Sequence, residues 1–286
     1  MKVAFLILTY KYPEQLDKLI EIMSIDEFKF FVHLDKKIDY KYFDFISARS
    51  NVIFIKNRVE VTWGSSSMNN AIVESYKEIL KHDEYDYINV ITSHHLPLKP
   101  SKEILKHLSE NKGYQFLNAI PYNIENSWWK RCEKRILKYS FVGLKFKGKY
   151  RIETLINNIV KKRRLPAEYV IAGSPSSYFF TSECVKFIVN EFNTNKKLIN
   201  FFKYVWGPDE FIFATLIYNS KFKTKIKDCL VYIEFKEEND GHSKIMQTND
   251  YNKLKMSGKF FAKKFDPYVD SQIITLINKL RNGDVE

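Results

Sequence analysis

The stretch VAFLILTYKYPEQLDKLI, residues 3–20, decides the fold class. It begins with a continuous apolar run at residues 3–9, which is typical of a strand covered on both faces. The Tyr-Lys-Tyr sequence at residues 10–12 indicates a turn, and Pro13 suits the first turn of a helix. The stretch therefore predicts a buried strand followed by an amphipathic helix, whose apolar residues recur at helical spacing: Leu16, Leu19, Ile20 and Met23.

The same alternation of strand and helix patterns continues to about residue 120. Strand patterns occupy residues 28–34, 51–55 and 85–92 and begin again at 115, and helical patterns occupy 65–81 and 101–109. Such alternation predicts an α/β fold with an open, mostly parallel twisted sheet and helices on both faces. Ligands of these sheets bind beyond the carboxyl ends of the strands. We expect a nucleotide at the polar residues found there: Thr9, Asp35 and the turn Thr92–His95.

The second half of the chain is also expected to contain both strands and helices. Residues 130–164 form its least regular segment, although 152–160 has helical spacing. Further strands are expected at 178–180 and 230–235, and further helices at 182–192, from 208 onward and at 270–280. No internal repeat or Gly/Ser/Pro linker occurs. We therefore expect one domain, residues 1–286, with a nucleotide-binding half at 1–120 and an acceptor-binding, catalytic half at 121–286.

The composition is that of a globular protein. Hydrophobic residues make up 45% of the chain, and 18 Tyr, 23 Phe and 4 Trp offer ring surfaces for core packing and for stacking. The three cysteines, Cys132, Cys184 and Cys229, lack metal-ligand spacing and are expected to be reduced thiols. No signal-cleavage site follows the N-terminal apolar run, and no run of about 18 apolar residues occurs. A cytoplasmic protein is expected.

The positive charge is concentrated in one segment. The formal net charge is +12, and residues 130–164 hold 13 Lys and Arg against Glu133 and Glu153. This predicts one patch that faces an anionic partner, which is a membrane surface, an acidic glycan or lipid phosphate, or nucleic acid. The helix in this segment is either an ordinary surface helix with a cationic end or an interfacial helix on anionic lipid. A peripheral contact with the inner face of a membrane through residues 150–164 follows from the second interpretation.

Two adjacent carboxylates, Asp209 and Glu210, follow Trp206-Gly-Pro at the expected start of an apolar helix. Acids there favour the helix dipole, so an ordinary helix start explains them. The alternative is a general base at the mouth of a cleft, where the helix N-terminus would keep Glu210 ionised. Asp209 would then bind sugar hydroxyls or cap the helix, and Trp206 would offer a ring face to a sugar.

Several familiar motifs do not occur. The chain has no GxGxxG, GxxxxGK[ST], GxSxG or HExxH sequence, which argues against dinucleotide enzymes, P-loop NTPases, serine hydrolases and zincins. His94-His95 has no nearby carboxylate, which makes a poor site for Mg²⁺ or Mn²⁺. A protein that binds a diphosphate without a metal needs cationic side chains in fixed positions. Lys259, Lys263 and Lys264 in SGKFFAKKFD are candidates, although lysines in such a segment are usually solvated.

Eight stretches in order resemble the core-2/I-branching β-1,6-N-acetylglucosaminyltransferase family, whose relatives include peptide O-xylosyltransferases and bacterial members. They cover nearly the whole chain: AFLILTYKYPEQLDKLI, FVHLDKKID, VTWGSSSMNNAIVESYKEIL, YDYINVITSHHLPLKP, GSPSSYFFTSECVKFI, WGPDEFIFATLIYNS, VYIEF and FFAKKFDP. The resemblance implies a GT-A glycosyltransferase fold, a UDP-sugar donor, inversion at the anomeric carbon and no metal or other cofactor.

The resemblance also implies roles for individual residues. Glu210 would be the catalytic base, Asp35 would bind the nucleoside, and Lys264 would neutralise the departing diphosphate. The other substrate-binding candidates are Thr9, Trp63, Gly64, His95, Lys130, Arg131, Ser174, Trp206, Asp209, Lys244 and Lys263. The sequence departs from the family at two places: His95 stands where an acid is common, and Phe235 stands where a Trp is expected.

The sequence therefore predicts an inverting, metal-independent transfer of a sugar from a UDP-sugar to a hydroxyl of a glycan or glycolipid. N-acetylglucosamine, xylose, glucose and galactose all remain open as the sugar. Bacterial surface polysaccharide or glycolipid synthesis is the expected setting. The competing hypothesis is a nucleic-acid-binding module that uses residues 130–164 and the aromatic residues, although no RNP or KH signature occurs.

Overall fold

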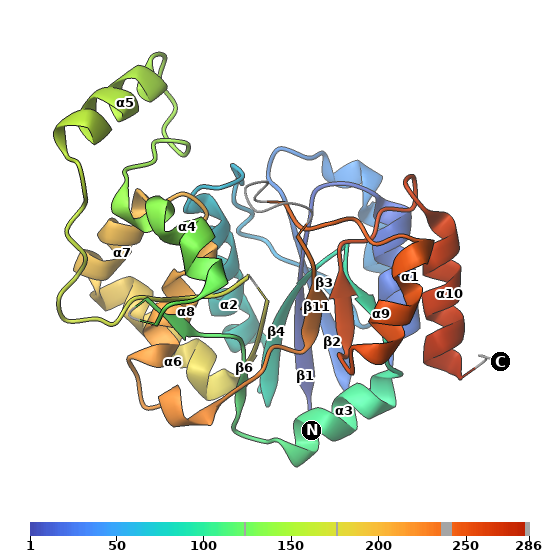
Figure 1. Ribbon diagram of the computed structural model, residues 1–286. Coiled ribbons are helices and arrows are strands. Elements are labelled where there is room, and N and C mark those ends of the chain that lie inside the picture. The colour runs from blue at the N-terminus through green and yellow to red at the C-terminus, as the bar shows by residue number, and fades with distance from the viewer. Residues whose placement is uncertain (123, 176, 236–241, 284–286) are drawn as a thin grey trace.

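The computed structural model describes residues 1–122, 124–175, 177–235 and 242–283. Its main feature is a seven-stranded sheet with the order β10-β6-β9-β4-β1-β2-β3 (Figure 1). A second sheet has the order β11-β12-β5, and β7 pairs with β8. The strands are β1 (Val3–Thr9), β2 (Phe28–Leu34), β3 (Val52–Phe54), β4 (Tyr87–Thr92), β5 (Leu96–Pro97), β6 (Gln115–Phe116), β7 (Ile120–Pro121), β8 (Ala172–Gly173), β9 (Tyr178–Thr181), β10 (Ile226–Lys227), β11 (Val231–Ile233) and β12 (Phe261–Lys263).

The main sheet is mostly parallel, as predicted. The neighbours β1 and β2, β2 and β3, and β1 and β4 are parallel, whereas β9 runs antiparallel to β4 and β6. Thr9 pairs with Leu34 and Leu8 pairs with Thr92, so the carboxyl ends of three strands reach the same edge. The ligand-binding edge expected from the sequence is therefore formed by residues of β1, β2 and β4.

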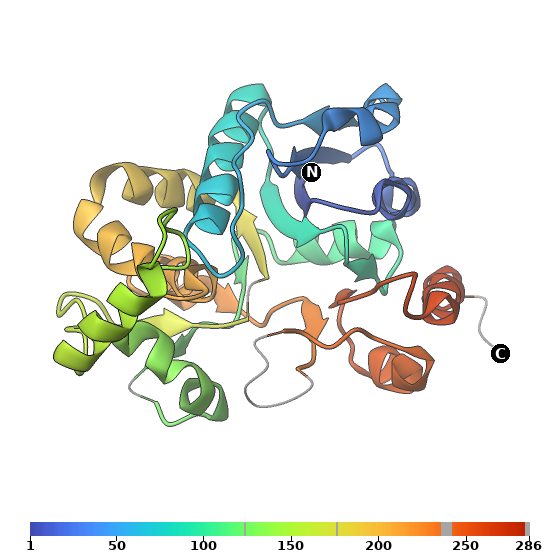
Figure 2. The same ribbon diagram turned by 90° about the horizontal axis from the view of Figure 1, so that it is seen from above.

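Helices lie on both faces of this sheet, as Figure 2 shows from above. They are α1 (Pro13–Met23), α2 (Ser67–His82), α3 (Ser101–Glu110), α4 (Ser127–Leu137), α5 (Lys149–Ile159), α6 (Ser182–Thr194), α7 (Lys196–Lys203), α8 (Ile212–Tyr218), α9 (Tyr251–Met256) and α10 (Ser271–Asn282). Short 3₁₀ helices are η1 (Tyr40–Tyr42), η2 (Asp44–Ala48), η3 (Pro208–Glu210), η4 (Lys223–Lys225) and η5 (Thr248–Asp250). None of the helices in the described ranges is both long enough and apolar enough to cross a bilayer.

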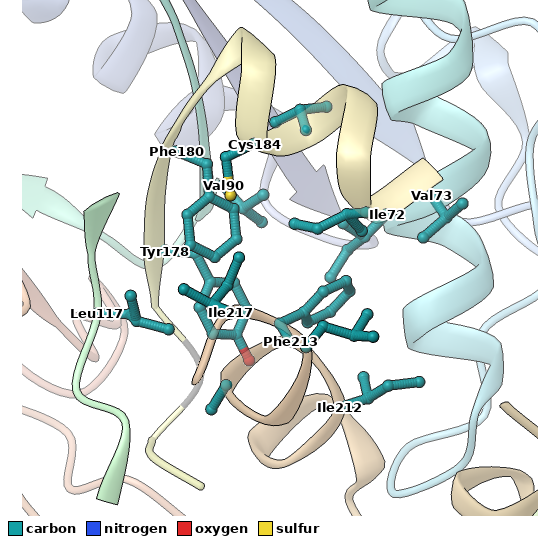
Figure 3. Close-up of a cluster of buried hydrophobic side chains, with 14 of the residues drawn as sticks. Ile72, Val73, Val90, Leu117, Tyr178, Phe180, Cys184, Ile212, Phe213 and Ile217 are labelled. Atoms are coloured by element: carbon teal, nitrogen blue, oxygen red, sulfur yellow. The ribbon is translucent and has the colours of Figure 1, made fainter. Parts of the chain in front are cut away.

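Strand β1 divides the core into two layers. Ala4 and Leu6 belong to one buried cluster with α2, α6 and α8, part of which Figure 3 shows. Phe5 and Ile7 belong to another cluster with α1 and α3. Since successive side chains of a strand point to opposite faces, both faces of β1 are covered, which explains its continuous apolar sequence. A smaller third cluster joins β5 and β12 to α9 and α10.

The structure corrects the sequence-based elements in the second half of the chain. The two acids after Pro208 were expected to begin an α-helix, but they lie in η3, and α8 begins only at Ile212. The N-terminus of α4, at Ser127, was not predicted, because residues 130–164 lack the simple alternation of the other segments. That helix buries Trp128, Trp129, Cys132 and Ile136 on one face.

Gly173 of β8 packs closely against Trp128 of α4. A Cβ atom at Gly173 would overlap the ring of Trp128, so the backbone or the ring would have to move. We expect Gly173→Ala to lower the free energy of unfolding by about 1–3 kcal/mol, as overpacking generally does. Urea unfolding measures this. Gly258→Ala is the control, because its Cβ meets open space and only its positive φ of 66° is strained. Its expected loss is about 1 kcal/mol, so a larger loss there than at Gly173 would contradict the packing argument.

Candidate active site

Glu210 lies where three distant segments meet. It ends the turn η3, which follows Gly207 at a positive φ of 61°. Its carbonyl oxygen accepts a hydrogen bond of 2.8 Å from the amide of Ser174, and the Gly207 amide donates one of 2.8 Å to the Gly64 carbonyl. The predicted candidates at positions 64, 174 and 210 are thus brought together by backbone hydrogen bonds, although they are far apart in the sequence.

Arg135 of α4 holds the carboxylate of Glu210. Its Nη2 lies 2.6 Å from Oε2 of Glu210, and its Nε donates a hydrogen bond of 3.2 Å to the Trp206 carbonyl. The guanidinium also lies 4.6 Å from the centre of the Trp206 ring and 5.1 Å from that of Phe211. A Cβ at position 207 would lie 2.6 Å from Nη2, so Gly207 provides the space as well as the turn. Several contacts therefore fix one ion pair.

The environment of Glu210 raises its pKa to about 7. Burial of the carboxylate is the largest cause, and the charge of Asp209 acts in the same direction. Arg135 opposes them most strongly, and Lys263 and Arg131 also lower the pKa. Glu210 does not lie at the N-terminus of an α-helix as expected, since η3 is a short separate turn and α8 begins at Ile212, and burial is the larger influence on its pKa. A carboxylate with a pKa near 7 suits a general base, because it is partly ionised and still binds a proton strongly.

An aromatic group lies beside this turn. The rings of Trp63 and Trp206 meet edge to face with centroids 4.8 Å apart, and His242 stacks on Trp63 at 4.5 Å. A Cβ at Gly64 would lie 2.8 Å from Nε1 of Trp206, so the Trp-Gly sequence allows the close approach of position 206. Trp63 remains 53% exposed and offers an apolar surface of the kind that sugar rings contact.

Lys263 connects the acidic turn with the sheet edge. It is partly buried at the end of β12, and burial lowers its pKa, while the charges of Asp209 and Glu210 act against that shift. The same lysine charge lowers the pKa of His95, whose main perturbation is burial. Coulombic coupling of this kind requires proximity. The predicted lysine is therefore near both Glu210 and the turn after β4.

Lys264 belongs to a neighbouring cluster around His94. Nδ1 of His94 lies 3.0 Å from the Phe265 carbonyl oxygen, so this nitrogen carries the proton and donates it. The pKa of His94 is lowered to about 4, chiefly by burial and also by the charges of Lys264 and Lys11, so the ring is neutral at pH 7. Lys11 in turn lies 3.6 Å from Asp266. Two lysines, Lys11 and Lys264, thus lie beside a neutral histidine at the end of β4.

Thr9 and Asp35 lie at the predicted edge of the sheet. Thr9 Oγ1 donates a hydrogen bond of 3.0 Å to Ser93 Oγ, and the Asp35 amide donates one of 2.9 Å to the Thr9 carbonyl. The carboxylate of Asp35 accepts hydrogen bonds from the amides of Lys37 and Val61. The backbone of the loop after β2 thus orients Asp35.

The remaining predicted residues have other partners. Lys244 lies 2.5 Å from Asp250 and 3.5 Å from Glu234, so its charge is balanced within the protein. Lys130 pairs with Glu125 on the surface at 2.8 Å. The guanidinium of Arg131 lies 5.7 Å from the ring centre of Phe235, the residue that replaces the expected Trp.

Sequence reasoning missed Arg135. The family resemblance implied Lys130 and Arg131, but Arg135 is one helical turn further along α4 and reaches Glu210. The useful signal was the spacing of four residues between Arg131 and Arg135, because both charges act on the same carboxylate. This spacing becomes informative only once residues 127–137 are known to be helical.

The described ranges contain no cluster of three or more His, Cys, Asp or Glu side chains that could hold a metal ion. His94 and His95 are adjacent, yet each directs Nδ1 to a protein partner, and Nδ1 of His95 accepts a hydrogen bond of 3.0 Å from the Thr92 amide. Both side chains are buried. Cations near the edge of the sheet are instead supplied by lysines.

Comparison with known proteins identifies the family of the chain. The family model described as Core-2/I-Branching enzyme matches residues 3–258. The chain belongs to this family. The resemblance drawn from the eight sequence stretches is confirmed, and so is the expected α/β fold class with a mostly parallel sheet.

The curated proteins that are similar to this chain include xylosyltransferases. The chain is 20% identical to xylosyltransferase oxt of Drosophila melanogaster over 99% of its own length, and 21% identical to xylosyltransferase 2 of Rattus norvegicus over 97%. It spans about a third of the length of these relatives, 34% and 33% respectively. Among solved structures, the bifunctional glycosyltransferase WbbM aligns with 97% of this chain and 49% of its own, at 15% identity and a TM-score of 0.44.

Proposed function

We propose that the protein is an inverting, metal-independent glycosyltransferase that moves a sugar from a UDP-sugar to a hydroxyl of a glycan. The observation that carries this proposal is the partly buried Glu210, held by Arg135 and with its pKa raised to about 7, in a member of the Core-2/I-Branching enzyme family. An inverting transfer needs one such base within hydrogen-bond reach of the attacking hydroxyl.

In the proposed reaction Glu210 removes the proton of the acceptor hydroxyl. The acceptor oxygen forms a bond to the anomeric carbon as the bond from that carbon to the diphosphate oxygen breaks. The electron pair of the broken bond stays on UDP, so negative charge grows there. Lys263 and Lys264 stabilise that growing charge, and preorganised cations in a partly buried site do so effectively.

We infer a position for the donor from the polar residues at the edge of the sheet. We propose that Asp35 binds the nucleoside beside Thr9, that the diphosphate lies near Lys11 and Lys264, and that the sugar approaches Glu210. Xylose is among the sugars to test, because the curated relatives are named xylosyltransferases. N-acetylglucosamine, glucose and galactose complete the set. A glycan or glycolipid of a bacterial surface, made on the cytoplasmic side of the membrane, is the proposed acceptor.

Incubation of the protein with each UDP-sugar and excess EDTA tests the proposal. We expect release of UDP in EDTA at the rate seen without it, and we expect UDP alone to raise the melting temperature, since a ligand that binds only the folded state stabilises it. UMP and GDP serve as matched controls. Activity that EDTA abolishes and Mn²⁺ restores would refute metal independence. No stabilisation by UDP and no UDP release from any donor would refute the transferase.

A nucleic-acid-binding module is the weaker interpretation of the basic segment. Arg135 pairs with Glu210, Arg131 lies over Phe235, and the side chain of Arg163 is buried against backbone carbonyls. These arginines are used within the protein. The concentration of charge in residues 130–164 therefore overstates the cationic surface that a polynucleotide would meet.

A further inference from the structure

The helix α5 exposes its apolar face. Ile152, Leu155 and Ile159 recur at helical spacing and are 44%, 59% and 72% exposed. None of the residues of α5 is buried. Figure 1 shows α5 standing off from the sheet beyond α4 and α7. An apolar stripe on a helix normally faces a core, so this stripe is expected to have a partner outside the described chain.

A polar face of the same helix makes the contacts with the protein. The side chain of Asn157 accepts a hydrogen bond of 2.8 Å from the Tyr139 amide and donates one of 2.8 Å to the Tyr139 carbonyl. Glu153 accepts a hydrogen bond of 2.5 Å from the Phe141 amide. Lys149 donates to the carbonyls of Val142 and Leu144. The polar contacts thus fix which face of α5 points outward, and that face carries the aliphatic side chains.

Exposed basic residues surround the apolar stripe. They precede α5, lie on it and follow it: Lys145, Lys147, Arg151, Lys161, Lys162 and Arg164. The aromatic side chains of Phe146 and Tyr150 are also exposed beside them. Aliphatic side chains with flanking aromatic and basic residues are the composition of helices that lie in the interface of an anionic bilayer.

We propose that this face of α5 docks on the surface of a membrane that contains anionic lipid. A second copy of the chain is a poorer occupant, because a two-fold contact would place the same ring of cations against itself. Nucleic acid is also poorer, because bases stack on aromatic rings and the centre of this face is aliphatic. A bilayer satisfies both the apolar stripe and the cations around it.

The segment that carries α5 is hydrogen-bonded to the part of the chain that leads into η3, the turn of Glu210. Arg163 donates hydrogen bonds of 2.7 Å to the Phe201 carbonyl and 3.1 Å to the Tyr204 carbonyl, and the Ser140 amide donates one of 2.9 Å to Tyr204. Tyr204 precedes Trp206 by two residues. Docking of α5 would therefore hold Glu210 at a set orientation to the lipid surface. If the proposed transferase function holds, the acceptor is a glycan carried by a lipid.

Flotation of the full chain with vesicles tests the docking, and it does not depend on enzymatic activity. We expect binding to vesicles of phosphatidylcholine with about one-third phosphatidylglycerol, weaker binding to phosphatidylcholine alone, and a decrease as salt rises. Leu155→Ser with Ile159→Ser should reduce binding by roughly tenfold or more, because two exposed apolar side chains no longer enter the interface. Met256→Ser is the matched control, since Met256 is 85% exposed on α9.

Charge variants test the contribution of the lipid headgroups to binding separately from that of the acyl chains. Replacing Lys161, Lys162 and Arg164 by Gln should weaken binding and flatten its salt dependence, whereas replacing Lys81, Lys102 and Lys255 by Gln should do neither. Equal binding by the Leu155/Ile159 variant and the wild type would overturn the proposal. So would an absence of vesicle binding, or light scattering that shows a dimer converted to a monomer by the same two serines. Binding of a labelled RNA by this face in the absence of vesicle binding would identify a polynucleotide instead.

Discussion

Glu210→Gln is expected to lower kcat for sugar transfer by about a thousandfold or more, while UDP binds as it does to the wild type. The glutamine keeps the size of the side chain and can still accept a hydrogen bond from Arg135, but it cannot take a proton from the acceptor hydroxyl. Transfer kinetics at pH 8, together with the shift in melting temperature caused by UDP, measure the two effects separately.

Two further variants make this result specific. Glu183→Gln removes an exposed carboxylate that pairs with Lys221 on the surface, and it should leave both measurements unchanged. Asp209→Asn removes the neighbouring acid of the same turn and should affect transfer less than Glu210→Gln. Near-normal turnover by the Glu210→Gln variant would remove Glu210 from the role of base. A larger loss for Asp209→Asn would give that role to Asp209.

The first half of the fold could be predicted from sequence because local signals and long-range structure agree there. The apolar run 3–9 matches β1 residue for residue, and the patterns at 28–34 and 101–109 differ from β2 and α3 by at most one residue. A strand covered on both faces needs no knowledge of its partners to be recognised. The polar residues at strand ends followed from the same alternation, which is why Thr9 and Asp35 were placed correctly.

The second half of the fold depends on contacts between distant residues, which local sequence patterns do not reveal. Residues 127–137 form a helix because Trp128 and Trp129 are buried against distant groups such as Phe211. The protonation of Glu210 depends on burial by residues from several segments, so its raised pKa could not follow from the local sequence around Pro208. Arg135 was missed for the same reason, because it contacts a residue that lies 75 positions away in the sequence.

Arg135→Met is the variant that tests how the ionisation of Glu210 is controlled. Arg135 is the main group that lowers the pKa of Glu210 from the value that burial alone would give. Its loss is therefore expected to raise that pKa above about 7. A carboxylate acts as a base only when ionised, and on the acid side its ionised fraction falls about tenfold for each pH unit. At pH 7 we expect kcat to fall by roughly tenfold or more, with partial recovery as the pH approaches about 9.

The pH profile distinguishes this positioning role from a purely structural one. Misplacement of the turn would lower kcat by the same factor at every pH, whereas a raised pKa moves the acid limb of the profile to higher pH. Arg135→Lys should move the acid limb part of the way back to its wild-type position. Lysine restores the charge but lacks the guanidinium fork that reaches both Glu210 and the Trp206 carbonyl. Arg131→Met should move it less, since Arg131 is the weakest of the identified influences on that pKa. An acid limb that stays in place in Arg135→Met would show that burial and Lys263 alone set the ionisation of the base.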